Sequence, residues 1–339
     1  MNAGRVDNVV AMMRAMRREA ETAPASRPDH VTYTTVISTL VAAGDMERAR
    51  AVLEEMGRAG VPASRVTYNV LIKGYCQQLQ VGKARELLAV DMAEAGIEPD
   101  VVTYNTLIDG CVLTDDSAGA VALFNEMRGR GIAPSAVSYT TLMKAFASSG
   151  QPKLAHKVFD EMEKDPRVAV DRAAWNMLVE AYCRLGLLEA AKKVVERMKA
   201  RGVQPDVATY GSLAKGIAVA RRPGEALLLW EEIKKEEMEV DGEVLEALAD
   251  VCVRAALFRK ALEIVARMEE MGMEANKGKY KRMYVELHSR MFTSRHASQA
   301  RQDRRRERKR AAEAFKFWLG LPNSYYATDW RLQDDGNLT

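Results

Sequence analysis

Long apolar segments, cysteines and aromatic residues are all scarce in this 339-residue chain. No run of about 18 apolar residues occurs, so no membrane-spanning helix is predicted. Four cysteines are too few for a scaffold held together by disulfides. The first twenty residues lack the apolar core of a secretory signal, and they are not Ser-rich and acid-poor like an organellar transit peptide. Aromatic residues make up 6%, whereas Met reaches 18 residues, a bias that favours helices.

Patterns that indicate an enzyme are also absent from the sequence. The spacings of the four cysteines fit no zinc site, and the histidines are scattered. No H-x-E or P-C-x-x-C signature of a nucleotide deaminase occurs, and the glycines form no phosphate loop. The sequence therefore predicts no catalytic residue, no metal and no cofactor. The cysteines are interpreted as small buried apolar residues: Cys76, Cys111, Cys183 and Cys252.

Charge is distributed unevenly along the chain, although the net charge is only +3. Residues 277–339 contain 15 Lys and Arg against 7 Asp and Glu, a balance of +8. The remaining 35 basic and 40 acidic residues give −5. A polyanion would therefore meet a local basic patch rather than a uniformly basic surface.

Internal repetition is the main feature of the sequence. Seven units follow one another in steps of 35 or 36 residues: 30–64, 65–100, 101–135, 136–171, 172–206, 207–241 and 242–276. An aromatic residue recurs at Tyr33, Tyr68, Tyr104, Tyr139, Trp175 and Tyr210, with Leu245 in the last unit. Alanine recurs at Ala49, Ala84, Ala120, Ala155, Ala191, Ala226 and Ala261. Methionine recurs at Met56, Met92, Met127, Met162, Met198 and Met268, with Ile233 in the gap.

Each unit is predicted to form two helices. In the third unit the first helix runs from Tyr104 to about Val112 and the second from Ser117 to Arg128, before Gly131 and Pro134 end the unit. One helical hairpin cannot bury its own apolar face, so the units are expected to stack. The fold class is therefore all-α, an α-solenoid of helix-turn-helix repeats.

The two ends of the chain depart from the repeat. Residues 1–29 align with a second helix only, so we expect that the chain starts within a repeat and that further repeats and any targeting peptide lie upstream. Residues 277–290 are predicted to form a capping helix, and residues 291–339 a basic extension that is helical or partly disordered.

The units resemble the pentatricopeptide repeat family in its plain 35-residue form, the P class. The resemblance rests on VTYNTLIDG at Val102–Gly110 and GIEPD at Gly96–Asp100, in seven units that stay in phase. The related tetratricopeptide repeat has 34 residues and no terminal P-D. The C-terminal string from Arg308 is also similar to the tail of a chloroplast RNA-processing member of the family. The resemblance implies a right-handed superhelix that binds single-stranded RNA, one base per repeat.

In this family two residues per unit choose the base: the residue after the aromatic position and the last residue of the unit. Carried onto this sequence, the pairs are Thr34 with Ser64, Asn69 with Asp100, Asn105 with Ser135, Thr140 with Asp171, and Asn176 with Asp206. Family correspondences translate these pairs into 5′-(A)-U-C-G-U-3′. The competing interpretation is that Asn, Thr and Asp recur at these places only as helix caps and turn residues.

A further position, before the Thr-Tyr pair, packs on the face of the base in this family. It is occupied by Val31, Val66, Val102, Val137, Ala173 and Ala208. These residues could equally pack between repeats. The last two units depart from the pattern, with Gly211, Glu243, Glu246 and Asn276 at the corresponding positions, so they are expected to be structural or to contact RNA loosely.

A cluster of basic residues in the tail offers non-specific phosphate contacts: Arg301, Arg304, Arg305, Arg306, Arg308, Lys309 and Arg310. A solvated helix explains the same cluster, and a nuclear-localisation signal is a weaker alternative. The resemblance implies a non-catalytic protein that processes and stabilises chloroplast transcripts and affects their translation, with the mitochondrion as the alternative compartment. The expected partner is single-stranded RNA, without a membrane, and a homodimer is compatible with the sequence. A peptide-binding scaffold of the tetratricopeptide type is the alternative function.

Overall fold

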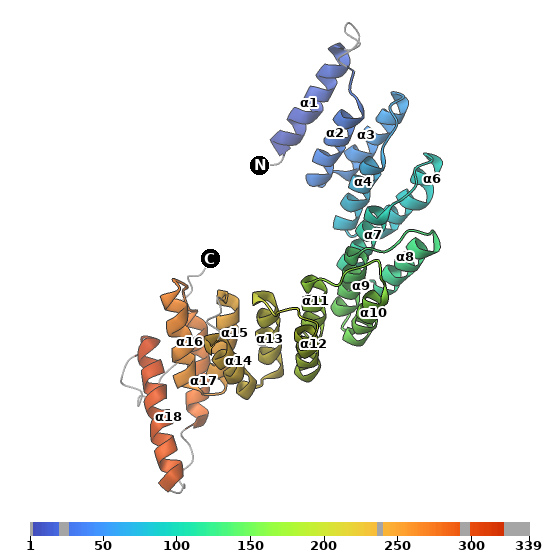
Figure 1. The fold of residues 1–339 in the computed structure, drawn as a ribbon. Helices are drawn as coiled ribbons and strands as arrows, with labels where there is room; N and C mark the ends of the chain where they lie inside the picture. Colours follow the sequence, from blue (N-terminus) through green and yellow to red (C-terminus); the bar gives the residue numbers. More distant parts are fainter. Residues whose placement is uncertain (1–2, 20–26, 236–239, 292–298, 322–339) are drawn as a thin grey trace. The chain divides into compact units, whose positions relative to one another are not determined.

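The computed structural model describes residues 3–19, 27–235, 240–291 and 299–321. Within these ranges the chain is helical and contains no strand (Figure 1). The chain divides into two compact units, and each is described by itself. Unit 1 contains residues 1–182 and 189–204, and unit 2 contains residues 183–188 and 205–339. The all-α solenoid of paired helices predicted from the sequence is confirmed.

Unit 1 begins with a single helix, and hairpins of two helices follow. Its elements are α1 (Ala3–Glu19), α2 (His30–Ala42), α3 (Met46–Arg58), α4 (Arg65–Gln77), α5 (Val81–Glu86), the π-helix η2 (Leu87–Asp91), α6 (Met92–Glu94), α7 (Val101–Leu113), α8 (Ser117–Gly129), α9 (Ala136–Ser148), α10 (Pro152–Lys164), α11 (Arg172–Cys183) and α12 (Leu188–Ala200). Unit 2 contains α13 (Val207–Ala220), α14 (Pro223–Lys235), α15 (Gly242–Arg254), α16 (Phe258–Glu270), α17 (Lys277–Met291) and α18 (Gln299–Trp318).

The first helix of each hairpin lies against the first helix of the next one. In unit 1 this row comprises α2, α4, α7 and α9, and in unit 2 it comprises α13, α15 and α17. Each of these helices begins at the first residue of its repeat, about three residues before the aromatic position at which the sequence pattern placed the start. The reason is that the last residue of the preceding repeat serves as the N-cap.

The residues that recur in the sequence form the core. Every recurring alanine has a relative exposure of 0%, and the recurring aromatic and methionine positions are buried as well. The aromatic hydroxyls keep a polar partner at the edge of the core, since Tyr104 donates to Glu126 at 3.0 Å and Tyr210 donates to Glu232 at 3.1 Å. The four cysteines are buried, as predicted, and burial raises the pKa of the Cys76 thiol to about 12.

A left-handed residue connects the two helices of a hairpin, at the fifteenth position of the repeat. Glycine supplies this conformation at Gly44 (φ 82°) and Gly150 (φ 68°), where a missing Cβ removes the steric cost. Other repeats place a residue with a side chain there: Leu79, Asp115, Arg221 and Ala256, with φ of 52–60°. The same turn therefore forms in every case, with backbone strain in four repeats.

The two 36-residue repeats of unit 1 absorb their additional residue in different places. In residues 65–100 the second helix contains η2, a π-helical turn in which one extra residue widens the helix. In residues 136–171 the second helix, α10, keeps 13 residues, and the closing loop 165–171 is one residue longer. Both solutions leave the first helices in step.

The C-terminal extension completes a further hairpin in unit 2. Tyr280, at the aromatic position of α17, is fully buried. On α18, Ala312, Phe315 and Leu319 are buried with the same spacing as Ala261, Ile264 and Met268 on α16. Phe315 stacks on Phe258 with a centroid distance of 5.3 Å. The sequence predicted a tail that is helical or partly disordered. Gln299–Trp318 is helical, and its apolar end packs on α16 rather than facing solvent.

Candidate nucleic-acid interface

The N-terminus of each first helix carries the residues that the sequence pattern singled out. The last residue of each repeat is the N-cap of the next first helix, and its side chain accepts a hydrogen bond from a backbone N–H three residues later. This group is Asp29, Ser64, Asp100, Ser135, Asp171, Asp206, Asp241 and Asn276. The capping interpretation is therefore correct for the last residue of each repeat. It does not exclude ligand binding, because a carboxylate accepts several hydrogen bonds and a hydroxyl keeps its own proton.

Three of the predicted pairs come together in unit 1. Thr34 and Ser64 both contact the Thr67 hydroxyl, at 2.9 and 3.0 Å. Asn105 Nδ2 donates directly to Ser135 Oγ at 3.5 Å. These residues are half-buried, so each pair presents a small polar surface at the end of its helix.

Asn69 and Asp100 form the third pair of this kind. The Thr103 hydroxyl lies 2.8 Å from Asn69 Oδ1 and 3.0 Å from Asp100 Oδ1. The outer oxygen of Asp100, Oδ2, lies 3.4 Å from the Arg65 guanidinium. Partial burial raises the pKa of Asp100, but the hydrogen bonds from Thr103 and the charge of Arg65 outweigh it, and the net pKa is lowered. This carboxylate is therefore ionised at neutral pH and acts as an acceptor only.

The remaining two pairs are arranged differently. The Thr140 hydroxyl donates to the carbonyls of Ala136 and Val137 in its own helix, while Asp171 caps α11 through the N–H of Ala174 at 2.9 Å. Asn176 lies on α11 in unit 1, and Asp206 caps α13 in unit 2, so this pair is divided between the units.

The predicted base-packing residues point away from the core. Relative exposures are 56% for Val31, 62% for Val66, 57% for Val102 and 59% for Val137. Ala173 and Ala208 are exposed as well. Packing between repeats, the alternative that the sequence left open, would bury these side chains. The valines form instead a row of exposed apolar groups directly beside the polar pairs.

Sequence reasoning missed two sets of residues near the pairs. Buried hydroxyls occupy the third position of several first helices, for example Thr103 on α7. Charged residues occupy the ninth position, one helical turn beyond the pair, where Lys73, Asp109 and Lys144 alternate in sign. Lys144 donates to Asp109 at 3.3 Å. The signal for both sets is their fixed place relative to the aromatic residue.

The departing repeats of unit 2 present paired charges. Glu243, at the position of the exposed valines, accepts from Lys215 at 2.7 Å. Lys279 donates to Glu246 at 3.0 Å. Gly211 offers no side chain at all. The polar pattern of unit 1 therefore does not continue into these repeats.

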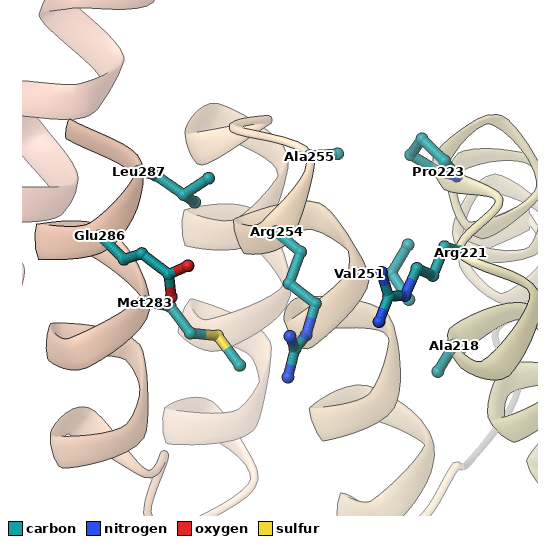
Figure 2. Close-up of a pocket in the computed structure, with 9 residues that line it drawn as sticks. All are labelled: Ala218, Arg221, Pro223, Val251, Arg254, Ala255, Met283, Glu286 and Leu287. Carbon is teal, nitrogen blue, oxygen red and sulfur yellow. The ribbon is translucent and has the colours of Figure 1, made fainter. Parts of the chain in front are cut away.

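Unit 2 also contains a hollow of about 420 Å³ near the C-terminal ends of its first helices. Figure 2 shows the Arg221 and Arg254 guanidinium groups and the Glu286 carboxylate around it. Its apolar lining includes Val251, Met283 and Leu287 (Figure 2). None of the predicted base-reading residues reaches this hollow.

The basic tail residues are placed on the backbone of α18. Arg308, Lys309 and Arg310 are exposed. The side chains of Arg301, Arg304, Arg305 and Arg306 lie outside the described residues. In the described part of the chain no group of His, Cys, Asp and Glu is arranged to hold a metal ion. No helix there has the length and apolarity needed to cross a bilayer.

Comparison with known proteins identifies the repeats. The model of the PPR repeat family matches residues 28–77, 63–113, 99–148 and 170–219, and the PPR repeat model matches residues 137–166 and 208–238. A chloroplastic pentatricopeptide repeat-containing protein of Arabidopsis thaliana is 64% identical over 351 residues, covering 98% of this chain and 45% of the relative. A mitochondrial one from the same plant is 28% identical, covering 90% of this chain and 39% of the relative.

Among solved structures, the crystal structure of PPR10 from maize is similar, with a TM-score of 0.61 and 26% identity. The similarity covers 91% of this chain and 46% of PPR10. The chain thus spans less than half the length of these relatives. With its helical hairpins in steps of 35 or 36 residues, the chain belongs to the pentatricopeptide repeat family, in its P class.

Proposed function

We propose that this chain binds single-stranded RNA with base selectivity and acts in the processing and stabilisation of organellar transcripts, without catalysis of its own. One observation carries the proposal: polar pairs recur at the ends of successive first helices, each beside an exposed valine. An unstacked base needs both elements, a polar edge to be read and an apolar surface against its face.

The relatives support this proposal. Maize PPR10 has been crystallised with an 18-nt psaJ RNA element. The Arabidopsis relative with 64% identity is chloroplastic, which favours the chloroplast for this protein, and other relatives are mitochondrial. A solenoid that holds RNA along its first helices would block exonucleases at the bound segment. It would also keep that segment from pairing with other RNA.

The proposed reading of the bases follows from hydrogen-bond chemistry. The Asp100 carboxylate accepts only, so it suits the N3–H of uridine, whereas the Ser135 hydroxyl can donate to the unprotonated N3 of cytidine. The five pairs together give 5′-(A)-U-C-G-U-3′, with the N-terminal repeats at the 5′ side. The exposed tail residues Arg308, Lys309 and Arg310 would add contacts to phosphate that do not depend on sequence.

Binding to short RNAs at two salt concentrations tests the proposal. RNAs that contain AUCGU in an unstructured context should bind more tightly than permuted RNAs of the same composition. Asn69→Thr and Asn105→Thr should each weaken this preference. Equal binding to all sequences would refute base reading. A fall in the logarithm of the binding constant of about 0.7 per log unit of salt for each neutralised phosphate would then assign the binding to charge alone.

A further inference from the structure

Four Thr and Ser hydroxyl groups are completely buried in the described part of the chain. Thr67, Thr103, Ser138 and Thr209 have a relative exposure of 0%, and each is the third residue of a first helix. A buried hydroxyl lowers stability unless it is hydrogen-bonded, so its partners show what the group holds in place.

Thr103 connects two residues from the same preceding repeat. Its hydroxyl accepts from the N–H of Asp100 at 3.2 Å, and its single proton faces Asn69 Oδ1 at 2.8 Å and Asp100 Oδ1 at 3.0 Å. Asp100 Oδ1 already accepts the N–H of Thr103 at 2.9 Å. Asn69 Oδ1 is the nearer of the two acceptors for the hydroxyl proton. This bond turns the amide oxygen of Asn69 inward, and Nδ2 is left without a partner among the described residues.

The neighbouring repeat shows what happens without this contact. Its third-position hydroxyl, Ser138, bonds to Ser135 at 3.1 Å and does not reach Asn105. Asn105 donates through Nδ2 to Ser135, and its Oδ1 is buried and lacks a hydrogen bond. The amide oxygens of the two asparagines therefore differ in that only Asn69 Oδ1 accepts a hydrogen bond from the third-position hydroxyl.

The next repeat lacks the hydroxyl altogether. Ala174 occupies the third position there, and the hydrogen bonds of the Thr140 hydroxyl go to the carbonyls of Ala136 and Val137 in its own helix. In the first repeat the hydroxyl returns. Thr34 donates to the His30 carbonyl at 2.7 Å, and it also lies 2.9 Å from the Thr67 hydroxyl. A third-position hydroxyl therefore adds a contact to the base-reading residue of the preceding repeat.

We propose that Thr103 is a positioning residue for base selection, and that its hydroxyl makes Asn69 present an amide donor to the base. A donor at this place favours uridine, whose O4 accepts, over cytidine, whose N4 donates. Thr67 would fix Thr34 in the same way. The inference rests on the proposed RNA-binding function, and it adds a residue outside the pairs that the repeat pattern identifies.

The test compares Thr103→Val with Thr103→Ser and with Thr106→Val in the full chain. Thr106 lies on the same helix, but its hydroxyl donates to the Val102 carbonyl at 2.7 Å and touches no reading residue. The readout is the ratio of affinities for AUCGU and ACCGU, which differ at the nucleotide assigned to Asn69. The same ratio at the third nucleotide, from AUCGU and AUUGU, serves as the reference.

In Thr103→Val the selectivity for uridine at the second nucleotide should fall roughly two- to tenfold, the range of one net hydrogen bond. The third nucleotide should keep its selectivity. Thr103→Ser introduces the residue that does not reach Asn105 in the neighbouring repeat, so it should lower the ratio as well while keeping the helix cap. Thr106→Val should leave both ratios unchanged. Thermal unfolding followed by circular dichroism identifies which variants are folded.

Unchanged selectivity in folded Thr103→Val would overturn the inference and leave the proposed function intact. A loss of affinity that is equal for all RNAs would also overturn it, because that is what a purely structural role predicts. Absence of any uridine preference in the unaltered protein would overturn the base-reading assignment, and this inference with it.

Discussion

Ser135 combines two roles that a single substitution can separate. It caps α9 by accepting the N–H of Ser138 at 3.3 Å, and it is the last residue of the repeat proposed to read cytidine. In the preceding repeat Asp100 caps α7 in the same way at 2.9 Å. Aspartate is as good an N-cap as serine. Ser135→Asp should therefore change the stability of the fold by less than about 0.5 kcal/mol.

The effect of Ser135→Asp on RNA binding should be much larger. The serine hydroxyl donates to N3 of cytidine, whereas the carboxylate repels this lone pair and accepts N3–H of uridine. If each preference amounts to about 1 kcal/mol, the two together shift the cytidine-to-uridine ratio by about 2 kcal/mol, or roughly thirtyfold. Competition between AUCGU and AUUGU RNAs in a fluorescence anisotropy assay measures this ratio.

Ser135→Ala is the matched control. It removes both the cap and the hydroxyl, so it should cost about 1 kcal/mol of stability and abolish the cytidine preference without creating one for uridine. A folded Ser135→Asp protein that still prefers cytidine would refute the reasoning. It would show that the last residue of the repeat is a helix cap and nothing more.

Three further predictions concern stability and are measured by denaturant unfolding. Leu79→Gly should stabilise the chain by about 0.5–1 kcal/mol, because Leu79 is exposed and has a left-handed backbone with φ 60°. Leu113→Gly is the control: Leu113 is exposed in a helix, where glycine should destabilise the chain by a similar amount. Met127→Ala should cost about 2–5 kcal/mol, since Met127 is fully buried; a smaller loss would contradict the packing. Burial raises the pKa of Cys76 from 9.0 to about 12, so burying the neutral thiol should stabilise the fold fully below pH 9. This contribution to the free energy of unfolding should decline between pH 9 and 12, and the decline should be smaller in Cys76→Ala.

The repeat determines how much of the fold is predictable from the sequence. Positions that recur seven times reveal the two helices, the buried aromatic, alanine and methionine residues, and the places of the polar pairs. The end of α18 was missed because it occurs once, behind a run of charged residues that obscures the spacing of Ala312, Phe315 and Leu319. Periodicity identifies a surface only where it is repeated.

Hydrogen-bond direction within the candidate site could not be predicted from the sequence. Asn69 and Asn105 occupy the same position, yet Asn69 accepts from the Thr103 hydroxyl, whereas Asn105 donates to Ser135 and the Ser138 hydroxyl bonds to Ser135 as well. The difference between Thr and Ser at this position has no meaning until the neighbouring repeat is placed beside it in space. Likewise, the exposure of the valines depends on packing between repeats rather than on their composition.

The π-helical turn Leu87–Asp91 has a consequence for how such arrays can change in evolution. A deletion or insertion in a chain that contacts successive nucleotides would ordinarily shift every downstream contact by one register. Here the surplus residue is confined to the second helix, and in another repeat to the closing loop, while the polar pairs stay on the first helices. Length can therefore vary on one side of each hairpin without altering the order in which bases are met on the other.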